Sequence, residues 1–380
     1  MADTLDAIPG ATATATPTSP PGAAGDPAEA TRYLLPPEAY VSAEWYEREQ
    51  RELFGRTWNL VAYEHDVPRP GAYVPVQAGA DPVLVVRGHD GELRAFVNMC
   101  RHRGMALACA AGHTDGNVRC PYHGWEFSLE GTLERIPQRA AQFAGVDPDR
   151  WGLVPVGLGT WDGLVFVNPD PGATPFAEWL GDVPRRFGPF DTSQLVEVFR
   201  MQVPIACNWK LYIENHVDVL HLWYLHDETL GMYDHTAFAH DQVGRHWVSE
   251  ERLRPGAERP RGLAPIAHLP GDERDVLRAN LIFPNVPTSS SETQWMTYQV
   301  VPTGPETSLL DIRIQGEPGA PELDGESIGQ LLRVLRDEDG GAVERIQRVL
   351  HSPRFEVGPL ASTHEAPITR FQRHVLEHLA

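Results

Sequence analysis

The sequence has few cysteines, no long hydrophobic run and little positive charge, and each shortage excludes a class of protein. Four cysteines in 380 residues are too few for a disulfide framework, which favours a reducing cytoplasmic location. No apolar run approaches the roughly 18–20 residues that a transmembrane helix needs. A formal net charge of −20 argues against nucleic acid as a partner.

The N-terminus also lacks the basic start and apolar segment of a signal peptide. Its content of Ala, Thr, Pro and Gly predicts a disordered tail over residues 1–32 instead. The chain contains no GxGxxG dinucleotide fingerprint, so any oxidation of NAD(P)H is expected on a separate protein. A length of 380 residues is sufficient for two domains.

Two short motifs contain cysteine and histidine at metal-ligand spacing. The run CRHRG contains Cys100 and His102, and the run CPYHGW contains Cys120 and His123. Two thiolates and two imidazoles are the ligands of a Rieske [2Fe–2S] cluster, in which one iron binds both sulfurs and the other binds both nitrogens. Such a cluster requires each motif to supply one ligand to each iron, and this pattern does so.

A structural zinc site is the alternative, because zinc accepts the same four ligands. Zinc fingers, however, usually pair two cysteines in one half of the motif and two histidines in the other. Gly104 and Gly124 follow the histidines here, where a tight loop would bring backbone N–H groups toward sulfide. The motifs therefore favour the Rieske cluster.

With these motifs the chain resembles the α subunits of Rieske non-haem iron oxygenases, the aromatic-ring-hydroxylating family, from about Tyr40 to the C-terminus. Respiratory Rieske proteins carry an extra cysteine in each loop, joined as a disulfide, but Met105 and Tyr122 occupy those positions here. The resemblance implies an α+β fold. A small Rieske β-sandwich domain would precede a catalytic domain with an antiparallel sheet and covering helices, of a helix-grip-like kind.

The hydrophobic pattern predicts elements that fit this organisation. Short β-rich runs split by Pro, Gly and Asp predict a β-sandwich from about Thr57 to Pro169, preceded by a helix at Ser42–Phe54. Trp295–Pro302 and Ser308–Ile314 predict antiparallel strands. Helices are predicted at about Ile328–Leu350 and Pro367–Leu379. The expected units are a helical segment 33–56 packed on the catalytic domain, a Rieske domain 57–170 and a catalytic domain 171–380.

A second candidate metal site lies in the run NWKLYIENHVDVLHLWYLH, which contains His221 and His226. Two histidines five residues apart point about 140° apart on a regular helix, so both face one ion only if the helix ends or distorts between them. The whole string is more specific than the histidine pair, and it resembles the family's mononuclear-iron motif. The resemblance implies that His221 and His226 bind an Fe(II) ion.

A non-haem Fe(II) oxygenase adds one carboxylate to two histidines and leaves positions open for O2 and substrate. The tract DEDGGAVERIQ resembles the family's late helix motif and implies Asp339 as the third ligand, with Asp337 and Glu338 as alternatives. A solvated acidic helix start is the other interpretation of this tract. His216, His235 and His240 match no ligand position and are interpreted as surface or pocket residues.

The resemblance also gives roles to Asp218 and Asn215 at the catalytic site. Asp218 would hydrogen-bond a ligand histidine of its own chain, His221, and the Rieske His123 of a neighbouring subunit, so that electrons cross between chains. This arrangement implies a homotrimer, with or without a β subunit. Arg101, Arg103 and Arg119 would offer local positive charge to a redox partner that docks near the Rieske loops.

The implied function is a terminal oxygenase. It would receive electrons from a ferredoxin or an NAD(P)H-dependent flavin reductase and use O2 to hydroxylate an apolar or aromatic small molecule. N- or O-demethylation and quaternary-amine monooxygenation use the same metal ligands and are alternatives. A Rieske electron carrier without catalysis is a further one, although a carrier needs only about 100 residues. The predicted pocket residues are Trp223, Tyr224, Leu230, Met232, Tyr233 and Asn280 to Phe283.

Overall fold

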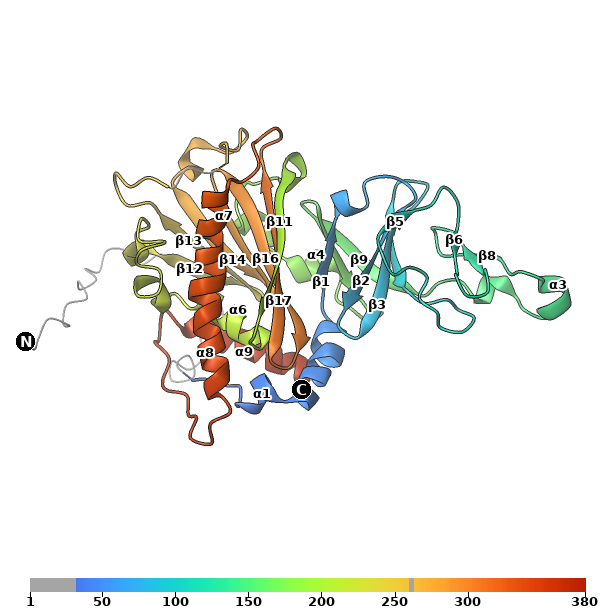
Figure 1. The fold of residues 1–380 in the computed structure, drawn as a ribbon, viewed down its shortest axis with the longest axis horizontal. Helices are drawn as coiled ribbons and strands as arrows, with labels where there is room; N and C mark the ends of the chain where they lie inside the picture. Colours follow the sequence, from blue (N-terminus) through green and yellow to red (C-terminus); the bar gives the residue numbers. More distant parts are fainter. Residues whose placement is uncertain (1–31, 260–262) are drawn as a thin grey trace, which may run out of the picture.

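The computed structural model describes residues 32–259 and 263–380, so the predicted tail lies almost wholly outside the described residues. The chain forms two β-rich bodies side by side, the first on the right of Figure 1 and the larger second body on the left. Helices cover only the second body extensively, which confirms the predicted α+β class. Within the described residues no helix is both long and apolar enough to cross a membrane.

The first body is a sheet in the order β1-β10-β9-β4-β3-β2-β5, and every neighbouring pair is antiparallel. Both faces of β3 are buried, because Val83 and Val85 face one core while Leu84 and Val86 face another. The strands are β1 (Asn59–Tyr63), β2 (Ala72–Ala78), β3 (Asp81–Arg87), β4 (Leu93–Val97), β5 (Gly112–His113), β9 (Pro155–Trp161) and β10 (Leu164–Asn168).

A small lobe extends from this sheet to the right-hand end of Figure 1. It is built on the short antiparallel strands β6 (Val118–Arg119), β7 (Glu126–Phe127) and β8 (Leu133–Arg135), followed by helix α3 (Arg139–Gln142). The loops that contain the two Cys/His motifs belong to this lobe. Its core includes Cys100, Cys120 and Trp125, so the motif cysteines are part of the packing.

The second body is an antiparallel sheet in the order β11-β17-β16-β15-β14-β13-β12. The two strands predicted near its end are confirmed as β16 and β17, which pair from Trp295–Gln315 to Gly304–Thr307. The strands are β11 (Val196–Ile205), β12 (Ala239–Val243), β13 (His246–Arg252), β14 (Val276–Ile282), β15 (Val286–Ser291), β16 (Gln294–Gly304) and β17 (Thr307–Gly316).

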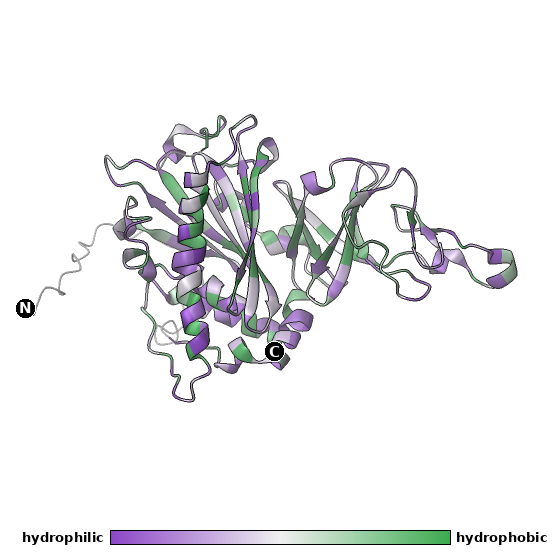
Figure 2. Ribbon diagram, in the orientation of Figure 1, coloured by the Kyte–Doolittle hydropathy of each residue, from purple (hydrophilic) through white to green (hydrophobic). Residues whose placement is uncertain are grey.

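Helices cover one face of this sheet, and the longest helical run crosses its front in Figure 1. The helix predicted at Ile328–Leu350 is confirmed as a continuous run with a π-helical centre. The elements are α6 (Trp209–Val217), α7 (Gly325–Leu332), the π-helix η8 (Arg333–Gly340), α8 (Gly341–Val349) and α9 (Ala366–Leu379). Trp209, Tyr212 and Phe371 pack in the core between helices and sheet. Figure 2 shows this as hydrophobic stretches along the central strands and hydrophilic loops around them.

The N-terminal segment packs on this second body. It contains α1 (Glu38–Val41), α2 (Ala43–Arg48) and the π-helix η1 (Glu49–Phe54), and the Ser42 side chain caps α2. Glu49 accepts hydrogen bonds from the Trp209 indole at 2.8 Å and from Lys210 at 2.6 Å, with both charged side chains fully buried. Loss of one partner would leave an unpaired buried charge, which typically costs about 3–5 kcal/mol. The pair therefore ties η1 to the start of α6.

The other face of the large sheet packs toward the first body. Trp58 and Phe166 of the first body share one core with Trp295 of β16, so the two bodies are joined by apolar packing. Helices α4 (Phe176–Leu180) and α5 (Val183–Arg186) contribute to the same core. The remaining short helices are η2 (Glu64–Asp66), η3 (Pro148–Arg150), η4 (Thr192–Gln194), η5 (Leu220–Trp223), η6 (His235–Ala237) and η7 (Gly271–Glu273).

Candidate metal centres

The two Cys/His loops have the same backbone construction. In the first, Cys100 N–H donates to Met105 O and Gly104 N–H donates back to Cys100 O. In the second, the corresponding bonds join Cys120 to Trp125 and Gly124 to Cys120. The φ angles of Gly104 and Gly124 are +74° and +70°, a conformation that favours glycine over any other residue. Each loop is thus a tight turn that presents its cysteine and histidine on one side.

The four motif side chains form two pairs. Cys100 and Cys120 are both buried, and burial together with the neighbouring Cys120 thiol raises the pKa of Cys100 to about 11. His102 and His123 lie at the outer edge with their Nδ1 atoms 3.2 Å apart, and His102 stacks on Trp125 at 5.0 Å. A cluster iron would remove the thiol protons, because metal-bound cysteine is a thiolate.

This arrangement fits a two-iron cluster better than a single zinc ion. A tetrahedral zinc site needs all four ligand atoms within one coordination sphere, with metal–ligand distances of about 2.0–2.3 Å. Among the described residues, only His221, His226 and Asp339 bring three such ligand atoms within 4.8 Å of one another. The sulfur pair and the nitrogen pair are therefore separated, as they must be when each pair binds its own iron.

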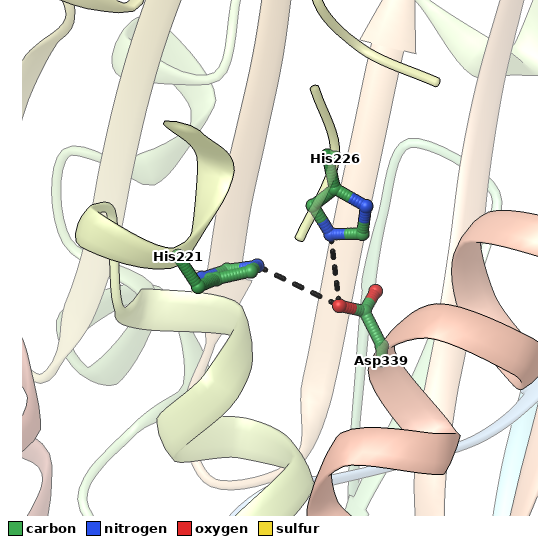
Figure 3. Close-up of side chains that lie close together, drawn as sticks. All are labelled: His221, His226 and Asp339. Atoms are coloured by element: carbon green, nitrogen blue, oxygen red, sulfur yellow. Dashed lines mark hydrogen bonds and ion pairs between the residues drawn. The ribbon is translucent and has the colours of Figure 1, made fainter. Parts of the chain in front are cut away.

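His221, His226 and Asp339 form the second candidate centre (Figure 3). Asp339 Oδ1 lies 2.9 Å from His226 Nε2 and 3.5 Å from His221 Nε2, so both imidazoles point toward one carboxylate oxygen. All three side chains are buried or nearly so. Two nitrogens and one carboxylate on one side of a point are the ligand set of a non-haem Fe(II) site with open positions.

The backbone explains how histidines five residues apart face one point. Helix α6 ends at Val217, and Asp218 adopts an extended conformation with φ −73° and ψ 123°. His221 then lies in the short 3-10 helix η5, whereas His226 follows after η5 has ended. The 3-10 helix that contains His221 therefore ends before His226, so a helix boundary lies between the two histidines, as the sequence argument requires.

Hydrogen bonds and opposite charges connect these three side chains. Burial would raise the pKa of Asp339, but hydrogen bonds and charge from His221 and His226 outweigh it and hold that pKa well below its usual range. Burial would lower the pKa of His221, but Asp218 and Asp339 raise it to about 9. Such a site binds a metal ion in exchange for protons, so its affinity depends on pH.

Three neighbours orient the candidate ligands. Asn215 Nδ2 donates to Asp339 Oδ1 at 2.8 Å, and Asp218 Oδ2 lies 3.5 Å from His221 Nδ1. Glu338 Oε2 lies 2.7 Å from His226 Nδ1. Glu338 was an alternative ligand in the sequence, but its carboxylate faces the nitrogen of His226 that points away from Asp339. Histidine ligands commonly donate this second N–H to a carboxylate.

The centre opens onto a cavity of about 280 Å³ between the sheet and its helices. Of the predicted pocket residues, Leu230, Met232 and Tyr233 line this cavity. The other predictions are wrong: Tyr224 is 73% exposed, Trp223 packs against His235 and His364, and none of residues 280–283 lines the cavity.

Several lining residues were not predicted from the sequence. His216, interpreted from the sequence as a surface or pocket residue, is a partly buried pocket residue whose ring nitrogens bind Tyr298 Oη at 2.7 Å and Asn280 O at 2.9 Å. Glu251 and Arg259 also line the cavity. They come from distant parts of the chain, and no motif pointed to them.

The fold and the two candidate ligand sets are those expected of a Rieske-type oxygenase α subunit, and comparison with known families agrees. A model of the Rieske [2Fe-2S] domain matches residues 57–154. A model of the ring hydroxylating alpha subunit (catalytic domain) matches residues 192–380. The chain belongs to the Rieske non-haem iron oxygenases.

Relatives of two kinds are similar to this chain. The alpha subunit of biphenyl 2,3-dioxygenase from Rhodococcus jostii (strain RHA1) is 34% identical over 186 residues, and the match spans 47% of this chain but only 40% of that subunit. The oxygenase subunit of glycine betaine monooxygenase from Chromohalobacter salexigens is 28% identical, over 89% of this chain and 84% of that protein.

Solved structures of both kinds share the fold. A quaternary ammonium Rieske monooxygenase superposes with a TM-score of 0.78 at 22% identity, over 93% of this chain and 97% of that chain. Naphthalene 1,2-dioxygenase from Rhodococcus sp. superposes with a TM-score of 0.73 at 23% identity, over 91% and 94% of the two chains. These likenesses support the architecture and leave the substrate open.

Proposed function

We propose that this chain is a terminal oxygenase that uses electrons from a separate redox protein to hydroxylate an apolar or aromatic small molecule with O2. The observation that carries the proposal is the pairing, in one chain, of two loops suited to a Rieske cluster with a two-histidine, one-carboxylate centre that opens onto a cavity. When bound, the cluster and the Fe(II) ion supply electron transfer and O2 activation.

The proposed ligands are Cys100, Cys120, His102 and His123 for the cluster, and His221, His226 and Asp339 for the iron. Asn215 fixes one oxygen of Asp339 by its hydrogen bond at 2.8 Å. The cavity adjoins the three iron ligands, with leucines and methionines over much of its wall. A substrate held there would meet O2 beside the metal.

We further propose that electrons cross between subunits through Asp218. In Figure 1 the lobe with the Cys/His loops lies at the end of the molecule away from the large sheet and its helices. His123 is exposed at that end, whereas Asp218 lies beside the ligand His221. This separation supports a head-to-tail homotrimer, with or without a β subunit, in which His123 of one chain meets Asp218 of the next.

The proposed partners are O2, the substrate, and a ferredoxin or an NAD(P)H-dependent flavin reductase, in the cytoplasm. Arg101 and Arg103 lie on the Cys/His loops, and each guanidinium lies over an aromatic ring, of Trp151 and Tyr122 respectively. Their charge suits an acidic redox partner. The proposed division is a helical segment 33–56, a Rieske domain 57–170 and a catalytic domain 171–380.

Oxidation of a methylated or quaternary amine, including N-demethylation, is the second candidate. The alignment with glycine betaine monooxygenase favours it, because that match covers most of both chains, unlike the match to the dioxygenase subunit. O-demethylation and aromatic hydroxylation would use the same metal ligands, so the cavity rather than the metal decides between them.

Metal analysis combined with a visible spectrum tests the central proposal. We expect two cluster irons and one further iron per chain, together with a Rieske absorbance. Two irons alone would indicate an electron carrier, and colourless zinc would indicate a zinc-stabilised protein. Product analysis with aromatic and methylamine substrates and a surrogate reductase then separates hydroxylation from demethylation.

A further inference from the structure

Glu251 is a buried carboxylate in the wall of the cavity, remote in sequence from the metal motifs. Side chains alternate along a strand, and on β13 this places Glu251 on the same face as Trp247. Both line the cavity, whereas the neighbouring Glu250 lies on the opposite face, is exposed and pairs with Arg278. The side chain of Glu251 is only 5% exposed.

One oxygen of this carboxylate is held by His235. Glu251 Oε2 lies 2.7 Å from His235 Nδ1, and the imidazole is 2% exposed. His235 Nε2 is buried without a hydrogen-bond partner. Imidazole, unlike arginine or lysine, carries no permanent positive charge, so the described contact of Glu251 provides a hydrogen-bonding group but no permanent counter-charge.

Arg259 is the only arginine or lysine among the described residues that line the cavity, and its guanidinium already interacts with groups other than Glu251. Its guanidinium donates to Tyr233 Oη and to the backbone carbonyls of Arg274 and Val276, and lies 3.4 Å from Glu292. Glu292 thus compensates its charge, while the ion pairs of the described residues give Glu251 no partner except His235. A buried carboxylate without a counter-charge is costly unless a ligand supplies one.

We infer that the cavity takes a substrate with a cationic nitrogen, whose ammonium group binds Glu251 while its apolar part lies against the leucine and methionine wall. This inference rests on the proposed oxygenase function and specifies its substrate class. Leu230, Met232, Leu277 and Met296 supply apolar surface. The cation would supply a counter-charge to Glu251 and leave the apolar end for oxidation.

Calorimetric titration of the iron-loaded protein with three probes of one shape tests the inference without turnover. The probes are benzylammonium, benzyl alcohol and benzoate, which differ chiefly in charge. We expect the wild-type protein to bind benzylammonium at least about tenfold more tightly than benzyl alcohol, and benzoate most weakly. Glu251→Gln should remove the preference for the cation and leave the affinity for benzyl alcohol within about twofold.

Glu250→Gln is the matched control, because it removes a carboxylate from the same strand on the opposite face and should change none of the three affinities. A preference for benzoate, equal affinities, or no binding of the cation would overturn the inference. The wild-type order decides even where Glu251→Gln does not fold. Iron content and the Rieske spectrum are measured separately, so failure of the oxygenase proposal is distinguishable from failure of the cation site.

Discussion

Replacement of Glu338 by alanine should weaken binding of the mononuclear iron without loss of the Rieske cluster. Glu338 Oε2 lies 2.7 Å from His226 Nδ1 and accepts a second hydrogen bond from Thr229 Oγ1 at 2.7 Å. The imidazole side chain is 2% exposed and the carboxylate 14%, so water replaces this contact poorly. Without it, His226 loses the group that fixes its ring and its tautomer.

The structure sets the expected size of this effect. A hydrogen bond to a charged group contributes about 1.5–3 kcal/mol net, and a buried contact of 2.7 Å lies within that range. This corresponds to roughly 10–100-fold in iron affinity, the usual effect of losing a partner of a metal-bound histidine. Glu338→Gln should retain part of the affinity, because its amide oxygen still accepts from Nδ1–H.

Equilibrium dialysis against a graded chelator, followed by iron analysis, measures the affinity, and the visible spectrum reports the cluster. Glu228→Ala is the control, because the exposed Glu228 shares Arg333 with Glu338 but does not contact His226. Unchanged affinity in Glu338→Ala would refute an orienting role. Complete loss of iron, equal to that of Asp339→Ala, would make Glu338 itself a ligand.

The other metal residues give predictions of different kinds. His102→Ala or Cys120→Ala should abolish the visible Rieske spectrum, since each removes one of four ligands; an unchanged spectrum would show that the cluster lies elsewhere. Asp339→Ala should remove the mononuclear iron and product formation while the Rieske spectrum persists, as metal analysis would show. Asp218→Asn should leave both metals bound yet slow single-turnover oxidation of the reduced cluster at least about 10–100-fold. Wild-type reoxidation with product formed would take Asp218 out of the electron path.

Metal-ligand motifs were readable from the sequence because the chemistry of the metal constrains spacing over a few residues. The Cys/His loops show this, since each needs only a cysteine, a histidine and a glycine with positive φ in one tight turn. The end of η5 between His221 and His226 was not visible, because neither glycine nor proline marks it. The required distortion could be stated from the 140° argument, but its position after Trp223 came from the structure.

Part of the cavity wall could not be predicted, because both faces of β14 are largely buried. On β14, Leu277 and Ala279 line the cavity, whereas Ile282 packs in the core toward the first body. A strand with one solvated face shows alternating polarity, but β14 offers no such signal over residues 280–282. Glu251 was overlooked for a related reason, since an acidic residue in a strand sequence normally indicates the solvent face.

The candidate iron centre lies where helices are irregular, and this explains why the proposed ligands converge. Asp339 and Glu338 are consecutive residues of the π-helix η8, yet their carboxylates contact opposite nitrogens of His226. His221 lies in the short helix η5 that follows α6, and Asn215 near the end of α6 reaches Asp339. π-Helical turns within helices occur frequently at functional sites. In this protein the π-helix η8 carries both carboxylates that contact His226, so one irregular helical turn supplies a candidate ligand and the residue that holds its histidine neighbour.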